Sequence, residues 1–284
     1  MSKKKVDKKK INEEVVNFYE KMPSKYKPKY HNPNYEDHLI NVPFRMLIVG
    51  GSGSGKSNIV VNIIQKFNDT FGNIKICCKD KNEPLYKLLA DKLDPESFQI
   101  YEGYKNIPSL NDKEEFDPSL QHLIIFDDLC LEKNQSLIED YLIRARKIAK
   151  GVSVIYLTQS YFKCPKTVRL NVNYIILKKI GSNRDLSCIL NEYSLGVDLP
   201  ELKKIYRNVC KTMKDFLLID LDAPDEKKFR DKFKTILNIK HEDSDSDKES
   251  ITTDENESSS DESDEELEGV KGKGLIELFK KYQK

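Results

Sequence analysis

The chain has 284 residues and a formal net charge of +1, because 48 Lys and Arg residues nearly balance 47 Asp and Glu residues. No run approaches the roughly 20 apolar residues that a membrane-spanning helix needs, and the first residues, MSKKKVDKKKI, lack the apolar core of a signal peptide. We therefore expect no membrane span and no secretion. Six scattered cysteines without C-x-x-C spacing favour reduced thiols over disulfides or zinc ligands.

Residues 1–40 are expected to form a basic N-terminal arm and lead-in. The first ten residues are rich in lysine and predict disorder, while residues 11–22 are compatible with a short helix. Prolines at positions 23, 28, 33 and 43 predict an extended segment after it. The lysines fit a solvated tail, a DNA-contacting arm or a nuclear address, and the sequence leaves these three interpretations open.

A glycine-rich loop between a strand and a helix is the strongest motif of the chain. The apolar run at residues 46–49 predicts a strand, and it ends at Gly50-Gly51-Ser52-Gly53-Ser54-Gly55-Lys56-Ser57, which fits G-x-x-x-x-G-K-S/T. Residues 59–67 predict the helix that follows. Glycines let successive N–H groups converge on phosphate oxygens, and the helix N-terminus adds positive charge there. We expect this loop to bind the phosphates of ATP, with Lys56 on the β- and γ-phosphates and Ser57 on Mg²⁺. The alternative is a glycine loop that binds nothing.

Three weaker elements and a loop separate this motif from the next one. Residues 73–78 predict a strand, residues 84–93 a helix with leucines at helical spacing, residues 98–101 a short strand, and residues 102–119 a loop.

A buried strand that ends in two carboxylates is the second motif. Four apolar residues, Leu123 to Phe126, precede Asp127 and Asp128. A continuous apolar run suits a strand covered on both faces of a parallel sheet, and ligands bind at the carboxyl ends of such strands. We expect Asp127 to hold Mg²⁺, directly or through water, and Asp128 to orient and polarise the attacking water. The alternative is an acidic strand end without a function.

The second half of the chain predicts a further alternation of helices and strands. Residues 134–150 predict a basic helix, and residues 152–159 a strand that ends at Gln159, a residue type that can sense a γ-phosphate or hold a water. After it we expect a basic loop at 161–171, a strand at 173–177, helices at 185–193 and 199–209, a strand at 216–220 and a closing helix at 226–237. This order predicts an α/β ATPase domain at 41–240 with a mainly parallel central sheet flanked by helices.

The C-terminal part is strongly acidic. Residues 242–268 hold 14 Asp and Glu residues and one Lys, a net charge of −13, so the rest of the chain carries +14. We expect residues 241–270 to be a disordered linker, with a solubilising role, a nucleic-acid mimic and a phosphorylation target as open alternatives. Residues 271–284 predict a short amphipathic peptide that folds on a partner protein. A basic body beside a detached acidic segment suggests a polyanionic partner.

Four blocks of the sequence carry a resemblance to a known family: NVPFRMLIVGGSGSGKS, HLIIFDDL, RARKIAKGVSVIYLTQSYFKCPKTVRLN and NYIILKKIGSNRDLSCILNEYSLG. With these blocks the chain resembles the FtsK/HerA superfamily of DNA-pumping P-loop ATPases, and more closely the poxvirus-type genome-packaging ATPases of large eukaryotic DNA viruses. The likeness covers residues 40–235 and leaves out the acidic segment and the C-terminal peptide. The last two blocks are the most specific, because glycine loops of this kind occur in many families.

The resemblance implies a RecA-like core that forms a homo-oligomeric ring, threads double-stranded DNA and hydrolyses ATP with Mg²⁺ at subunit interfaces. On its pattern the glycine loop is the Walker A motif, Asp127 and Asp128 are Walker B, and Gln159 is the sensor. Many members have glutamate where this chain has the shorter Asp128. The family also implies an arginine finger that acts in trans. Arg146 is our first choice and Arg144 and Arg169 are alternatives, although each arginine also fits a DNA-phosphate contact or a plain surface charge.

The resemblance further implies a motor that packages viral DNA into a capsid, located in the host cytoplasm at viral factories and associated with the virion. A capsid or other virion protein is the expected partner of the C-terminal peptide. Candidate contacts to DNA phosphates are Lys163, Lys166, Lys178, Lys179 and Arg184. Three alternatives stay open: a helicase or segregation pump without a capsid partner, a P-loop nucleotide switch or kinase, and a ring component that binds ATP without turning it over.

Overall fold

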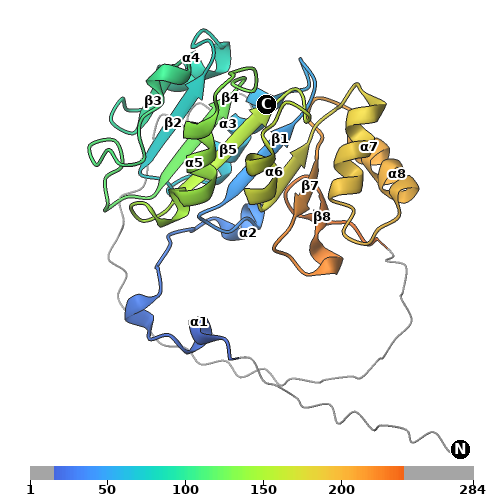
Figure 1. Cartoon of the computed structure of the whole chain (residues 1–284), viewed down its shortest axis with the longest axis horizontal. Coiled ribbons are helices and arrows are strands. Elements are labelled where there is room, and N and C mark those ends of the chain that lie inside the picture. The colour runs from blue at the N-terminus through green and yellow to red at the C-terminus, as the bar shows by residue number, and fades with distance from the viewer. Residues whose placement is uncertain (1–15, 240–284) are drawn as a thin grey trace, which may run out of the picture.

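The computed structural model describes residues 16–239 (Figure 1). The predicted lysine-rich start, acidic linker and C-terminal amphipathic peptide lie outside these residues. Within them, a nine-stranded sheet has the order β3-β2-β4-β5-β1-β6-β7-β8-β9. Neighbouring strands are parallel from β3 to β6 and antiparallel from β6 to β9. The predicted α/β class with a mainly parallel central sheet is therefore confirmed.

The parallel strands form where the sequence has continuous apolar runs. They are β1 (Arg45–Val49), β2 (Asn73–Cys78), β3 (Phe98–Glu102), β4 (His122–Asp127), β5 (Val152–Thr158) and β6 (Tyr174–Leu177). Every residue of β2, β5 and β6 is buried, as expected for strands covered on both faces. The antiparallel extension consists of β7 (Leu217–Asp220), β8 (Phe229–Asp231) and β9 (Thr235–Ile236).

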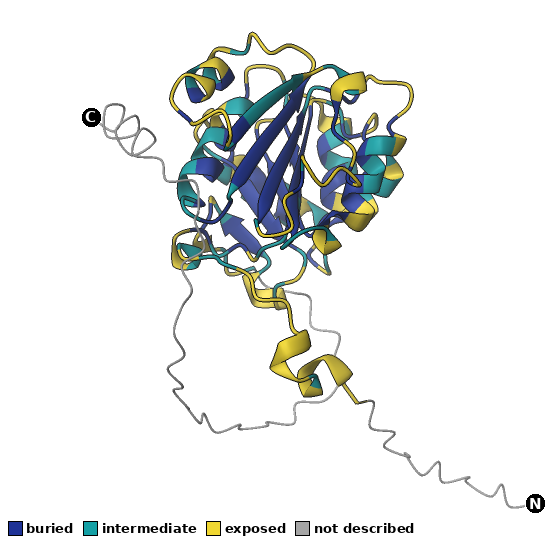
Figure 2. Ribbon diagram, turned by 90° about the vertical axis from the view of Figure 1, so that its left-hand side faces the viewer, coloured by how far each residue is buried: buried dark blue, intermediate teal, exposed yellow. Residues whose placement is uncertain are grey.

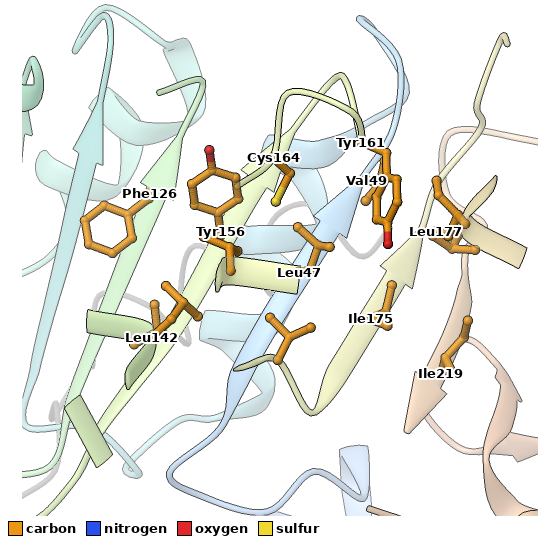
Figure 3. Packing of buried hydrophobic residues seen from close by; sticks show 14 of the residues in the cluster. Leu47, Val49, Phe126, Leu142, Tyr156, Tyr161, Cys164, Ile175, Leu177 and Ile219 are labelled. Atoms are coloured by element: carbon orange, nitrogen blue, oxygen red, sulfur yellow. The ribbon is translucent and has the colours of Figure 1, made fainter. Parts of the chain in front are cut away.

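Helices cover both faces of the sheet (Figure 1). They are α3 (Lys56–Lys66) and α4 (Pro84–Ala90) on one face, and α5 (Ser136–Arg144), α6 (Lys166–Asn171), α7 (Asn183–Glu192) and α8 (Leu199–Val209) on the other. Strand β1 shows why: Met46 and Ile48 belong to the apolar cluster that includes α3, whereas Leu47 and Val49 belong to the opposite cluster (Figure 3). Alternate residues of a strand point to opposite faces.

Shorter turns complete the described chain. They are α1 (Phe18–Lys21), α2 (Tyr35–His38) and the 3₁₀ turns η1 (Ser24–Tyr26), η2 (Tyr104–Asn106), η3 (Ala145–Lys147) and η4 (Asp225–Lys227). No helix among residues 16–239 is long and apolar enough to cross a membrane. All six cysteines have free thiols, and five of them are buried.

The lead-in divides into an exposed arm and a packed segment. The arm around α1 is exposed (Figure 2), with Phe18 at 75% of its surface accessible. From His31 onward the chain contacts the body: the His31 backbone N–H donates to Gln121 Oε1, and Gln121 Nε2 donates to the His31 carbonyl at 2.9 Å. Ile40 is fully buried. Residues 31–44 are thus part of the folded unit.

Three expected boundaries are wrong. The basic loop at 161–171 contains helix α6, which begins directly after Pro165 and buries Val168 in the apolar cluster on its side of the sheet. The helix predicted over 134–150 ends at Arg144 and continues as η3. The closing helix at 226–237 is instead η4, β8 and β9, because β8 pairs with the open edge of β7. Partner-strand hydrogen bonds outweigh the helical spacing of the apolar residues there.

Candidate functional site

One edge of the sheet gathers the predicted site residues. Strand β5 lies between β1 and β4, and all three run parallel. Their carboxyl ends therefore meet at the same edge, where the glycine loop follows β1, Asp127 and Asp128 end β4, and Gln159 follows β5. Clefts at this edge are where open α/β sheets bind ligands.

The glycine loop is held so closely that only glycine fits at its ends. A Cβ at Gly50 would lie 2.5 Å from Ser54 Oγ and 2.6 Å from Lys178 Cβ. Gly55 has φ +86°, a left-handed conformation that favours glycine, and a Cβ there would lie 2.6 Å from the Met213 carbonyl oxygen. The Gly50 N–H donates to the Thr158 carbonyl at 3.2 Å, and the Gly51 N–H to the Lys179 carbonyl at 3.0 Å. The loop is thereby tied to both strands that flank β1.

Lys56, the first residue of α3, lies across this loop. Its Nζ donates to the Gly50 carbonyl at 3.0 Å and to the Gly51 carbonyl at 3.1 Å. Burial lowers the pKa of the Lys56 ammonium, and the nearby charges of Asp127 and Asp128 act in the opposite direction. Lys56 is also the first residue of the 11-residue helix α3, and the helix dipole favours an anion at this end.

Asp127 makes a hydrogen bond that the sequence analysis did not predict. The Tyr86 hydroxyl, from α4, donates to Asp127 Oδ2 at 2.6 Å. Burial raises the pKa of Asp127, whereas the Tyr86 hydrogen bond and the Lys56 charge lower it. Burial also raises the pKa of the Tyr86 phenol far above its usual value, and the Asp127 charge acts in the same direction. No local pattern marks Tyr86, since it is 41 residues from Asp127 in the sequence.

Asp128 and Gln159 contact each other beside this cluster. Gln159 Nε2 donates to Asp128 Oδ1 at 3.1 Å. Asp128 has φ +56°, in the left-handed region that aspartate enters more readily than most side chains. The carboxylate and the amide thus form a polar pair at the open rim, next to the ammonium of Lys56.

The donor set fits a nucleotide triphosphate with a hard divalent cation. Converging loop N–H groups, a helix N-terminus and an ammonium suit phosphate oxygens, and the Ser57 hydroxyl with the Asp127 carboxylate offers the oxygen ligands that Mg²⁺ takes. The buried Ser54 hydroxyl, which has no hydrogen-bond partner, lies in the same loop. Glycine at positions 50 and 55 lets the loop pack closely against Lys178 and Met213 and so fixes its shape.

Within the described residues, none of the three candidate finger arginines makes a hydrogen bond or ion pair with this cluster. Arg146 is in η3, near Tyr30 and near Arg45, the first residue of β1, so it lies at the amino edge of the sheet. Arg144 donates from Nε and Nη2 to Asp140 at 2.6 and 2.5 Å. Arg169 donates to Glu192 at 2.8 Å and lies 4.9 Å above the Tyr161 ring.

The candidate DNA contacts divide into one buried and four exposed side chains. Lys178 is only 1% exposed, and its Nζ donates to the carbonyls of Met213 at 2.7 Å and Asp215 at 2.9 Å. The expectation that Lys178 contacts DNA is therefore wrong. Its side chain instead packs closely against Gly50 of the glycine loop. The exposed ones follow the carboxyl ends of β5 and β6: Lys163, Lys166, Lys179 and Arg184.

Comparisons with known proteins point to one family. The family model for the poxvirus A32 protein matches residues 33–223. No curated protein sequence matches the chain. Similar solved structures include the genome packaging NTPase B204 of Sulfolobus turreted icosahedral virus 2 with ATP-gammaS, at 16% identity and a TM-score of 0.48, covering 70% of this chain and 100% of that one. The pCW3 conjugation coupling protein TcpA has 14% identity and a TM-score of 0.44, covering 68% and 60%.

Proposed function

Because the chain belongs to the poxvirus A32 family of genome-packaging ATPases and is itself an ATPase, we propose that it is the motor that drives viral double-stranded DNA into the capsid. One observation carries the proposal: the ammonium of Lys56, the carboxylate of Asp127 and the Asp128–Gln159 pair all lie around one glycine loop at the same edge of the sheet.

In the proposed chemistry, the N–H groups of residues 50–57 bind the phosphates of ATP, and Lys56 exchanges its two carbonyl partners for β- and γ-phosphate oxygens. Ser57 and Asp127 would hold Mg²⁺, which would neutralise charge on the phosphates. Asp128 accepts a hydrogen bond from the attacking water and takes its proton, while Gln159 fixes the carboxylate. Water oxygen bonds to the γ-phosphorus, the bond from that phosphorus to the β,γ-bridging oxygen breaks, and ADP and phosphate leave.

The position of Arg146 supports action on a neighbouring subunit. It lies at the amino edge of its own sheet, beside Arg45, whereas the glycine loop lies at the carboxyl edge. Within one subunit it therefore cannot stabilise charge on a γ-phosphate. A homo-oligomeric ring that brings one subunit's amino edge to the next subunit's site would complete the site in trans.

The exposed basic side chains near the nucleotide site support DNA binding. Lys163 and Lys179 lie on the segments that follow β5 and β6, and Lys166 and Arg184 lie in the first turns of α6 and α7. Contacts from such side chains to phosphates are independent of base sequence and weaken with salt. We place this activity at cytoplasmic sites of virus assembly.

The test is the ATPase rate of the purified full chain with and without linear double-stranded DNA at low and moderate salt. We expect strong stimulation by DNA, lost in Lys56→Ala and Arg146→Ala. Arg144→Ala is the matched control, because that guanidinium is already paired with Asp140 in its own helix. Loss of a finger typically costs about 10³-fold or more in turnover.

Mixing the two inactive variants separates action in cis from action in trans. Lys56→Ala supplies an intact Arg146, and Arg146→Ala supplies an intact site, so partial recovery is expected if the finger crosses an interface. Hydrolysis that is indifferent to DNA at both salt concentrations would refute the translocase and favour a nucleotide switch or kinase. No recovery on mixing would refute the assignment of Arg146.

A further inference from the structure

Tyr86 is a fully buried tyrosine whose hydroxyl reaches into the nucleotide site. Its side chain has no accessible surface, and its hydroxyl donates to Asp127 Oδ2 at 2.6 Å. Helix α4, which carries Tyr86, begins with Pro84 and packs on the same face of the sheet as α3, which carries Ser57. The phenol thus contacts one of the two residues proposed to hold Mg²⁺.

The chemistry of the two groups fixes the direction of their hydrogen bond. An ionised carboxylate can only accept, so the Tyr86 hydroxyl must donate its single proton to Asp127. The bond occupies Asp127 Oδ2 and leaves Asp127 Oδ1 for a cation.

We propose that Tyr86 is a positioning residue for the divalent cation of the ATPase site, which it serves by orienting Asp127, one of the two proposed ligands. The proposal rests on the proposed nucleotide site. Partners of this kind, one shell outside the metal ligands, fix ligand orientation, and their loss typically lowers metal affinity about 10- to 100-fold.

Burial makes the phenol suited to this role. A hydroxyl shielded from water does not exchange its protein partner for a water molecule, which favours a lasting hydrogen bond to Asp127. The ring itself packs in the apolar cluster with Leu89 and Ile76. The ring is thus part of the core, and only the hydroxyl contacts Asp127, so the two roles can be separated by removing one oxygen atom.

The test is Tyr86→Phe in the full chain, which removes only that hydroxyl. The readout is binding of a fluorescent ATP analogue as Mg²⁺ is titrated, and again in EDTA. We expect the half-saturating Mg²⁺ concentration to rise about tenfold or more, with binding in EDTA unchanged. Binding in EDTA also shows that the variant is folded.

Tyr101→Phe is the matched control. Tyr101 lies on strand β3, and its hydroxyl also donates to a carboxylate, that of Glu115. We expect its Mg²⁺ titration to follow that of the wild type. Equal Mg²⁺ titrations for Tyr86→Phe and wild type would refute the positioning role and leave Tyr86 a packing residue. Equal weakening in Mg²⁺ and in EDTA would refute it too, since the effect would then lie in the loop. A wild-type chain that binds no nucleotide would overturn the proposed function itself.

Discussion

Acid should destabilise this protein through one buried histidine of the lead-in. His38 has no accessible surface, and its ring stacks on Phe67 with centroids 3.8 Å apart. Burial, with the positive charges of Lys66 and Arg230 also contributing, lowers its pKa from 6.5 to about 4, against a smaller opposing effect of Asp37. The Ile40 N–H donates to His38 Nδ1 at 3.1 Å, so a proton on that nitrogen would place one donor against another.

The sign of the effect follows from where the proton binds first. The pKa of His38 is lower in the folded state than in the unfolded state, so the unfolded chain takes up the proton first as the pH falls. Stability from this group is complete above pH 6.5 and is lost between 6.5 and about 4. At about 1.4 kcal/mol per pH unit, the loss relative to pH 7 is about 2 kcal/mol at pH 5 and at most about 3 kcal/mol.

Urea unfolding of the wild type and of His38→Asn at pH 7 and pH 5 measures this loss. Asparagine does not titrate, and its side-chain oxygen can accept from the Ile40 N–H, so the variant keeps that hydrogen bond and loses the stacking. We expect it to be less stable at pH 7 but to lose about 2 kcal/mol less than the wild type between the two pH values. Parallel losses in both proteins would refute the reasoning.

Two further changes probe the site and the fold. Gly55→Ala places a methyl group 2.6 Å from the Met213 carbonyl oxygen at φ +86°, and it should weaken binding of a fluorescent ATP analogue more than tenfold. Gly53→Ala is the control, because Gly53 has φ +69° and open space around it, so the change should cost only the backbone strain of about 1 kcal/mol. Equal effects of the two variants on binding would contradict the close approach at Gly55. Arg230→Met removes a buried guanidinium that bonds Asp220 and the carbonyls of His38, Leu39 and Phe233, and should lower the free energy of unfolding by about 3–5 kcal/mol in urea titrations; a loss below about 1 kcal/mol would show that the network is dispensable.

Elements with a strong local pattern were predictable from the sequence. Strand β2 runs from Asn73 to Cys78 as expected, and β1, β4 and β5 match within a residue or two, because a continuous apolar run bounded by polar residues defines a buried parallel strand. Strand β8 was not predictable. Phe229 and Phe233 are spaced as on a helix, yet β8 pairs with β7 and brings Arg230 to Asp220, and that partner lies outside any sequence window.

The site shows the same division between local and tertiary signals. The glycine loop, the Asp127-Asp128 pair and Gln159 each end a strand, so the topology alone brings them to one edge. Tyr86 and Lys178 act through distant partners. The leucine spacing at residues 84–93 predicted a helix, and Leu89 and Leu93 are buried, but that spacing did not mark Tyr86, which is fully buried beside them. Lys178 follows the end of a strand, so the sequence alone suggested a phosphate contact. The structure shows that its ammonium donates to the carbonyls of Met213 and Asp215 instead.

The two edges of the sheet constrain how a ring could form. Strand β5 has seven residues, which at about 3.3 Å per residue separate Gln159 at one edge from the η3 turn at the other by about 20 Å. An arginine side chain cannot span that distance, so Arg146 either serves a neighbouring subunit or has no part in catalysis. If it serves a neighbour, the contact joins the amino edge of one sheet to the carboxyl edge of the next. Such a contact is head-to-tail, and head-to-tail contacts that close generate rings. The mixing experiment therefore also tests the geometry of the assembly.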